Sequence, residues 1–226
     1  MPVNEEKYKE IIKELIPQNI QLAAVSKIQS VADIKDLYDL GQRDFGENYV
    51  QEMVEKQTLL PSDIRWHFIG HLQSNKVKYI APFVHLVQSV DSLKLLTEIN
   101  KQAKKINKTI HCLLQIHIAQ EETKFGLDEN ELDEIMSTLQ KNSPPFSNIY
   151  ISGFMGMASF TEDTQKVKSE MKSLQSLFKK YQSLSTTNCR LSTLSMGMSG
   201  DYKLAIEEGS NMVRIGSLLF GARPKR

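Results

Sequence analysis

The stretch NIQLAAVSK, residues 19–27, followed by VADIKDLYDLG, residues 31–41, decides the fold of this chain. The first run is apolar, as in a buried strand, and the second has the spacing of an amphipathic helix. The same alternation recurs in seven further apolar runs, each followed by a charged or amphipathic segment: RDFGEN (43–48), IRWHFIG (64–70), VHLVQSV (84–90), IHCLLQIHIA (110–119), IYISGFMGMA (149–158), RLSTLSM (190–196) and NMVRIGS (211–217). Eight strand–helix units are therefore predicted.

Eight such units favour a parallel sheet that is buried on both faces. We predict an α/β fold, a single (β/α)8 barrel of the TIM type with an extra helix at the N-terminus. A Rossmann-like open sheet is the alternative. No Pro- or Gly-rich linker divides the chain, so residues 1–226 are expected to form one domain.

Two of the expected helices carry internal support. Asp128 and Glu131 have the spacing of a capping box. The helix after them presents one apolar face, formed by Leu132, Ile135, Met136 and Leu139. The long segment near residue 170 does the same with Met171, Leu174, Phe178 and Tyr181.

The composition argues against several classes of function. Lys and Arg number 28 and Asp and Glu number 27, which gives a net charge of +1 without a long basic run; this disfavours nucleic-acid binding. No apolar stretch approaches the roughly 20 residues of a membrane span, and the charged N-terminus does not resemble a signal sequence. We therefore expect a cytoplasmic protein, in which Cys112 and Cys189 are buried, reduced thiols.

The active site of such a barrel lies at the carboxyl ends of its strands. Reactive or polar residues at these ends are Lys27, Asn48, His71, Met196, Ser199 and Arg214. Lys27 is either a solvated loop lysine or a desolvated amine able to form a Schiff base with an aldehyde. Asn48 is either a helix cap or a ligand contact.

Glycines and serines gather after the last two predicted strands. Ser199, Gly200, Gly216 and Ser217 can bring backbone amides and hydroxyls close to a ligand, and barrels often bind a phosphate group there. Each Gly-Ser pair is common in turns, but their coincidence at these two strands indicates a phosphate cup. No GxxxxGK[ST] or GxGxxG motif is present, which disfavours a nucleotide loop.

A metal site is not predicted. His67, His71, His111 and His117 lack an HExxH pattern or paired carboxylates. Neighbouring Trp66 and Phe68 are expected in the core.

Four long motifs, LAAVSK (22–27), FGENYVQE (45–52), WHFIGHLQSNK (66–76) and LSMGMSGDYKLAIEEGSNMVRIGSLLFG (194–221), occur in an order that resembles the YggS family of pyridoxal phosphate homeostasis proteins. That family is similar in fold to the N-terminal barrel of alanine racemase, and its members hold pyridoxal 5'-phosphate (PLP) without an established reaction of their own. The resemblance implies PLP as cofactor and apo PLP-dependent enzymes as possible recipients. We expect a monomer.

The resemblance also implies a role for each cofactor-binding residue. Lys27 forms the Schiff base with PLP, and Arg214 faces the pyridine nitrogen. The remaining residues bind the phosphate or line the ring: Ser199, Gly216 and Ser217 in the first group, Asn48 and Met196 in the second. Two positions depart from the family, Ile28 where threonine is more usual and Gly156 where a polar or larger residue is frequent; both concern pocket shape.

Arg214, facing the pyridine nitrogen, would affect which reactions bound PLP could support. A guanidinium stays protonated, so it can only donate to the pyridine nitrogen and leaves the ring a poor electron sink. This suits binding and racemase-type chemistry better than transamination. Racemisation also needs an acid/base group on each face of the substrate. In alanine racemase one of them is a tyrosine from a C-terminal domain that this chain is expected to lack, and Tyr49 and Tyr202 each open a predicted helix.

We therefore predict a PLP-binding protein without turnover. The alternatives are an amino-acid racemase and a cofactor-free barrel enzyme acting on a phosphorylated metabolite, which would leave Lys27 and Arg214 without a joint role.

Overall fold

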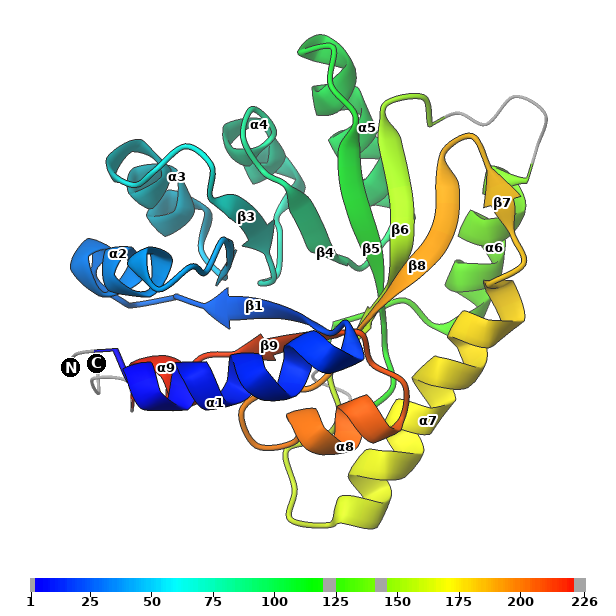
Figure 1. The fold of residues 1–226 in the computed structure, drawn as a ribbon. Helices are drawn as coiled ribbons and strands as arrows, with labels where there is room; N and C mark the ends of the chain where they lie inside the picture. The colour runs from blue at the N-terminus through cyan, green and yellow to red at the C-terminus, as the bar shows by residue number, and fades with distance from the viewer. Residues whose placement is uncertain (1–2, 120–124, 141–145, 222–226) are drawn as a thin grey trace.

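Eight parallel strands form a closed barrel in the computed structural model, which describes residues 3–119, 125–140 and 146–221 (Figure 1). Pairing runs from β1 to β6 in order, and β6–β8, β8–β9 and β9–β1 contacts close the ring. Closure confirms the predicted barrel over the open sheet. The barrel strands are β1 (Gln21–Val25), β2 (Asp44–Glu47), β3 (Arg65–Phe68), β4 (Leu86–Val90), β5 (Ile110–Ile116), β6 (Ile149–Gly156), β8 (Cys189–Ser195) and β9 (Met212–Ile215).

One short strand lies outside the predicted pattern. The two-residue β7 (Ser185–Thr186) pairs antiparallel with β8, so the seventh and eighth predicted strands are β8 and β9.

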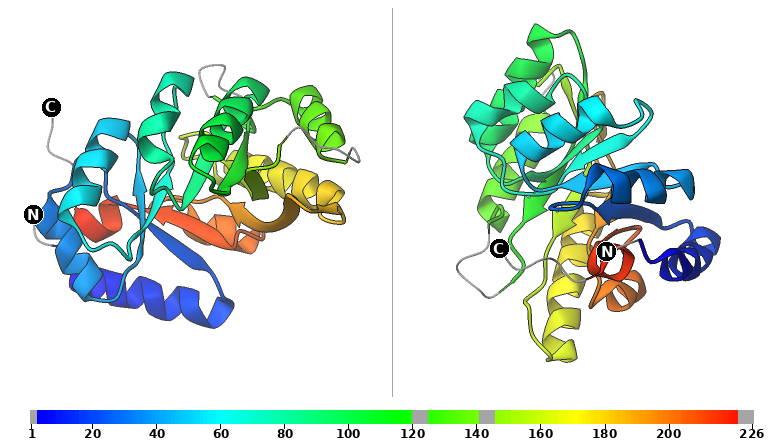
Figure 2. Two further views of the ribbon diagram at one scale, coloured as in Figure 1. Left: turned by 90° about the horizontal axis from the view of Figure 1, so that it is seen from above. Right: turned by 90° about the vertical axis from the view of Figure 1, so that its left-hand side faces the viewer.

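Helices surround the strands, as Figures 1 and 2 show. The helix expected at the N-terminus is present as α1 (Glu5–Leu15) and packs beside α9 (Ser217–Phe220). The other helical elements are η1 (Ile16–Gln18), α2 (Val31–Asp39), α3 (Val50–Leu59), η2 (Ser74–Lys76), α4 (Val77–Ile80), α5 (Leu93–Lys105), α6 (Glu129–Leu139), α7 (Thr164–Tyr181) and α8 (Tyr202–Glu207). The long α7, yellow in both figures, packs against β6 and β8. No helix in the described part of the chain is long and apolar enough to cross a membrane.

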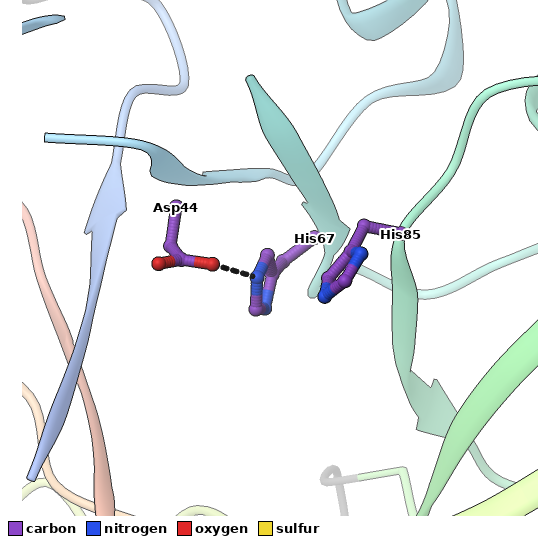
Figure 3. Close-up of side chains that lie close together, drawn as sticks. All are labelled: Asp44, His67 and His85. Carbon is purple, nitrogen blue, oxygen red and sulfur yellow. Dashed lines mark hydrogen bonds and ion pairs between the residues drawn. The ribbon is translucent and has the colours of Figure 1, made fainter. Parts of the chain in front are cut away.

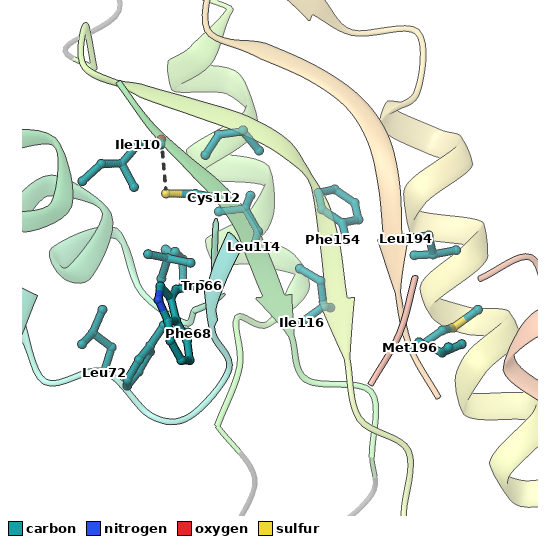
Figure 4. Packing of buried hydrophobic residues seen from close by; sticks show 14 of the residues in the cluster. Trp66, Phe68, Leu72, Ile110, Cys112, Leu114, Ile116, Phe154, Leu194 and Met196 are labelled. Atoms are coloured by element: carbon teal, nitrogen blue, oxygen red, sulfur yellow. Dashed lines mark hydrogen bonds between the residues drawn. The ribbon is translucent and has the colours of Figure 1, made fainter. Parts of the chain in front are cut away.

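The main hydrophobic core lies between the barrel and its helices. Successive strand residues point to opposite faces, and the outward set packs under the helices (Figure 4). Members of this core drawn there include Trp66, Phe68, Cys112, Leu114, Phe154 and Leu194. A smaller apolar cluster of Leu86, Leu113, Met155 and Met212 comes from the alternate strand positions. The remaining alternate positions on several strands carry buried polar residues.

The structure contains the capping box, the apolar helix faces and the buried cysteines that the sequence predicted. Asp128 and Glu131 form a capping box at the start of α6, and the four apolar residues of its predicted face are buried. Met171, Leu174 and Phe178 of α7 are buried, and Tyr181 is partly buried against the core. Cys112 and Cys189 are free, buried thiols, and burial raises the pKa of both.

Candidate functional site

A cavity of about 400 Å³ opens at the carboxyl ends of the strands, the end predicted for the active site. Its lining comes from the segments that follow β1, β2, β3, β6, β8 and β9. The volume is typical of a small-molecule site. The charged residues of its lining are Lys27, Asp201 and Arg214, so cations outnumber anions and the cavity suits an anionic ligand.

All of the predicted site residues except Met196 and His71 line this cavity. Lys27, Asn48 and Arg214 come together there with the four residues of the predicted phosphate cup, Ser199, Gly200, Gly216 and Ser217. Met196 does not, because it is 1% exposed and packs in the core under the helices. Met198, two residues later, lies in the lining instead. His71 also lies outside it, bonded to Asp91 and stacked on Phe125.

Sequence reasoning missed the segment after β6. Met157, Ser159, Phe160 and Thr161 all line the cavity. Their position after a predicted strand was the available signal, but none of these residue types by itself indicates a ligand.

The backbone on both sides of Lys27 is held by a buried ionic cluster. Lys56 Nζ donates to the Ser26 carbonyl at 2.7 Å, to Glu47 Oε1 at 2.8 Å and to Glu52 Oε1 at 2.6 Å. The Ser26 hydroxyl also donates to Glu47, at 2.7 Å. Burial raises the pKa of Glu47, although Lys56 and Ser26 act in the opposite direction. The cluster thus fixes the residue before Lys27.

The residue after Lys27 is strained. Ile28 has φ of 66°, in the left-handed region, which is unfavourable for a β-branched residue. Its N–H donates to Glu52 Oε1 at 2.5 Å, and this charge-assisted hydrogen bond stabilises the unfavourable backbone conformation. Threonine, which the resemblance implies at this position, is β-branched as well, so isoleucine in its place does not change this constraint.

The two loops of the predicted phosphate cup are in contact. The Gly216 N–H donates to Ser199 Oγ at 3.3 Å, which leaves the serine hydroxyl hydrogen available to a ligand. A Cβ on Gly216 would approach the Val25 carbonyl oxygen to 3.1 Å, so a side chain here would crowd the cavity wall. Asp201, also in the lining, accepts the Met198 N–H at 2.5 Å and is thereby turned toward its own loop.

Arg214 is held at the bottom of the cavity by neutral acceptors. Its Nη1 donates to the Ser195 carbonyl at 2.9 Å and to Ser195 Oγ at 2.7 Å, and Nη2 donates to the Gly156 carbonyl at 2.9 Å. Within the described residues, Nε makes no hydrogen bond. Burial lowers the pKa of Arg214 to about 10, while Asp201 acts in the opposite direction, so the guanidinium stays charged at neutral pH.

The glycine at 156 has a structural reason. A Cβ there would lie 2.6 Å from Leu174 Cδ2 and 3.0 Å from Ile118 Cδ1, so a larger residue would require the ends of these two side chains to shift. The Gly156 carbonyl accepts from Arg214.

At the opposite end of the barrel, Asp44, His67 and His85 lie close enough to suggest a metal site, with donor atoms within 4.8 Å of one another (Figure 3). Two of the three residues, Asp44 and His67, are already engaged in hydrogen bonds. Arg65 binds both oxygens of Asp44, at 2.8 and 2.5 Å, and His67 Nε2 lies 3.0 Å from Asp44 Oδ1. Burial acts to raise the pKa of Asp44, but the hydrogen bonds from Arg65 and His67 outweigh it and hold that pKa well below its usual range.

Comparison with known proteins decides the family. The family described as alanine racemase, N-terminal domain, matches residues 5–224. A pyridoxal phosphate homeostasis protein of Pasteurella multocida is 39% identical, with 90% of this chain and 87% of that protein covered. One from Synechocystis is 38% identical over 96% of this chain and 97% of that protein. This chain belongs to the pyridoxal phosphate homeostasis protein family.

Solved structures agree with this family assignment. PipY of Synechococcus elongatus with PLP bound is 32% identical, covers 96% of this chain and 99% of its own, and has a TM-score of 0.85. An alanine racemase of Clostridium difficile, at 17% identity and a TM-score of 0.76, shares the fold; 63% of its chain is covered.

The two tyrosines considered for acid/base roles lie outside the cavity lining. The Tyr202 hydroxyl donates to Glu14 of α1 at 3.0 Å, and burial together with that carboxylate raises its pKa to about 12. Tyr49 is exposed at the start of α3.

Proposed function

We propose that this protein binds PLP as a Schiff base on Lys27 and buffers or delivers it, without turnover of amino acids. The main support for the proposal is that Lys27, the buried Arg214 and the Ser-Gly phosphate cup line the same cavity. The PLP-bound PipY structure and the names of the relatives support it. The proposal treats residues 1–226 as one barrel domain, acting in the cytoplasm as a monomer.

The residues present fit the cofactor. Asn48 Oδ1 is buried without a hydrogen-bond partner among the described residues, and Asn48 lines the cavity, so the site supplies an acceptor that a ligand can satisfy. The serine hydroxyls and backbone of the cup suit a phosphate dianion, and two cations in the lining favour its charge. Arg214 Nε supplies a donor for a ring nitrogen.

When bound, PLP supplies an electron sink for carbanion chemistry, provided that its ring nitrogen is protonated. Arg214 works against that condition. Its guanidinium can donate but has no proton to give up at neutral pH, so a pyridine nitrogen facing it is held as an acceptor. The arrangement therefore favours holding the cofactor over strong activation.

The lining also favours binding over turnover. Among the described residues that form it, none is a tyrosine, histidine or cysteine. Lys27 can serve one face of a substrate after its release, but a second group on the opposite face is required for racemisation. Asp201 is turned to the Met198 amide.

The binding claim is tested by adding PLP, removing the excess by gel filtration and recording the visible absorption. We expect a retained band in the wild type that Lys27→Ala loses. Lys203→Ala is the matched control, because the Lys203 side chain is 68% exposed and lies outside the cavity lining. An equal retained band in Lys27→Ala would contradict the assignment.

The turnover claim is tested by α-proton exchange in D2O with L- and D-alanine and a panel of other amino acids. We expect no exchange at an enzymatic rate, together with PLP transfer to an added apo-enzyme. Rapid deuterium incorporation with inversion, lost in Lys27→Ala, would establish a racemase instead.

A further inference from the structure

A continuous row of buried polar side chains crosses the interior of the barrel from Arg214. The guanidinium donates to Ser195 Oγ, and the Ser195 hydroxyl donates to Gln88 Oε1 at 2.7 Å. Ser195 lies on β8 and Gln88 on β4, which are not neighbours in the sheet, so this bond spans the barrel. Ser195 and Gln88 are both 0% exposed.

The row continues to the far end of the barrel. Gln88 Nε2 lies 2.9 Å from His67 Nδ1, and His67 Nε2 lies 3.0 Å from Asp44 Oδ1. Figure 3 shows this last step, with His67 directed at the carboxylate. Arg65, partly exposed, holds Asp44 there as its ion-pair partner. The row thus links the cavity to the opposite end.

The donors and acceptors of the row favour one direction for its hydrogen bonds. Arginine has donors and no acceptor, so Ser195 Oγ must accept from it and pass its own hydrogen to Gln88 Oε1. The Gln88 amide then donates to His67 Nδ1 and, at 3.2 Å, to the weakly accepting Met212 Sδ. His67 must therefore carry its proton on Nε2, which donates to Asp44.

The opposite orientation of the Gln88 amide is unfavourable. It would place Oε1 against the Met212 sulfur and deprive the Ser195 hydroxyl hydrogen of its acceptor. Leaving a buried donor without an acceptor is strongly unfavourable.

We propose that Ser195, Gln88 and His67 position Arg214 through this one-way row of donors, which holds His67 as the neutral Nε2–H tautomer. Each member fixes the next, and the row together with the Ser195 and Gly156 carbonyls keeps the guanidinium in one orientation, although no carboxylate among the described residues hydrogen-bonds to it. The tautomer follows from the row alone, whereas the consequence for bound PLP rests on the proposed function.

The tautomer is tested without PLP by long-range ¹H–¹⁵N correlation of the ¹⁵N-histidine-labelled protein. The chain has five histidines, and His67→Gln identifies the resonances of His67. We expect an unprotonated Nδ1 and a protonated Nε2 at neutral pH. An Nδ1–H tautomer or a fully protonated ring would overturn the one-way row.

The positioning role is tested by the absorption of bound PLP in Gln88→Met and Ser195→Ala. A loosened Arg214 lets the ring nitrogen take up a proton, and this nearby positive charge should move the pH midpoint of the visible band to lower pH. We also expect PLP to bind about tenfold more weakly, as for the loss of one hydrogen bond.

The matched control is Gln115→Met. Gln115 is a buried glutamine on β5 that donates to the Phe125 carbonyl at 2.6 Å and takes no part in the row. It should keep the wild-type midpoint and affinity. Unchanged values in both row variants would overturn the positioning role, whereas failure of the wild type itself to bind PLP would refute the proposed function and leave the tautomer result as the test of the row.

Discussion

Removing one partner from the ionic cluster beside Lys27 should strongly destabilise the fold, and Lys56→Met tests this. The Lys56 side chain is 6% exposed, and its ammonium is the ion-pair partner of Glu47, whose side chain is 0% exposed. Breaking a buried pair by removing one partner costs about 3–5 kcal/mol, because the other charge is left uncompensated. Glu52, 21% exposed, can turn toward water and should add little.

We expect urea denaturation at pH 7 to show this loss of about 3–5 kcal/mol in the free energy of unfolding. Lys9→Met is the control: Lys9 contacts Glu5 at 2.6 Å with the same i,i+4 spacing as Lys56 and Glu52, but the side chains are 66% and 56% exposed. Its loss should stay near or below about 0.5 kcal/mol.

The pH dependence gives a second check. Burial already raises the pKa of Glu47, and removal of Lys56 raises it further above the unfolded value. Such a group stabilises the folded state below its unfolded pKa and loses that contribution as pH rises through the folded pKa, so the Lys56→Met deficit should shrink on acidification. A deficit below about 1 kcal/mol at pH 7, or one that grows on acidification, would refute the reasoning.

Three further outcomes are expected. Ile28→Asn should raise the free energy of unfolding by about 1 kcal/mol in urea titrations, because asparagine tolerates the left-handed backbone at φ of 66°; an unchanged or lower midpoint would argue against strain. PLP at about 100 times Kd should stabilise the wild type by about 2.7 kcal/mol in thermal melts, and Ser199→Asp should lose most of that gain by repelling the phosphate; equal shifts would place the cup elsewhere. Asp44→Asn should cost stability at pH 7, and the difference should disappear as pH falls through the depressed folded pKa of Asp44, since the wild type then loses the same charge; a pH-independent difference would contradict the ion pair.

The barrel, and the position of several predicted residues in one cavity, could be predicted because they depend on local patterns. The different hydrophobic periods of strands and helices reveal the alternation of β-strands and α-helices. Residues at the carboxyl ends of the strands lie on one face of a barrel, and Lys27 and Arg214 therefore line one cavity. Met196 was expected in the lining, but β8 ends at Ser195 and Gly197, at φ of 96°, redirects the chain so that Met198 reaches the cavity.

The polar row could not be predicted from spacing. Ser195 and Gln88 lie 107 residues apart, and each looks like an ordinary polar residue in a strand. Their pairing depends on which strands face each other across the closed barrel. Likewise, Lys56 lies on α3 and gives no sign in the sequence that it contacts the segment before Lys27.

The central claim, that Lys27 holds PLP in this cavity, is tested most directly by borohydride reduction of the PLP-loaded protein followed by peptide mapping. Reduction converts a Schiff base into a stable amine, so the labelled lysine can be identified by mass. We expect one pyridoxyl label per chain on the peptide that contains Lys27, and none in Lys27→Ala under the same conditions. A label of equal yield on another lysine, or retained in Lys27→Ala, would contradict it.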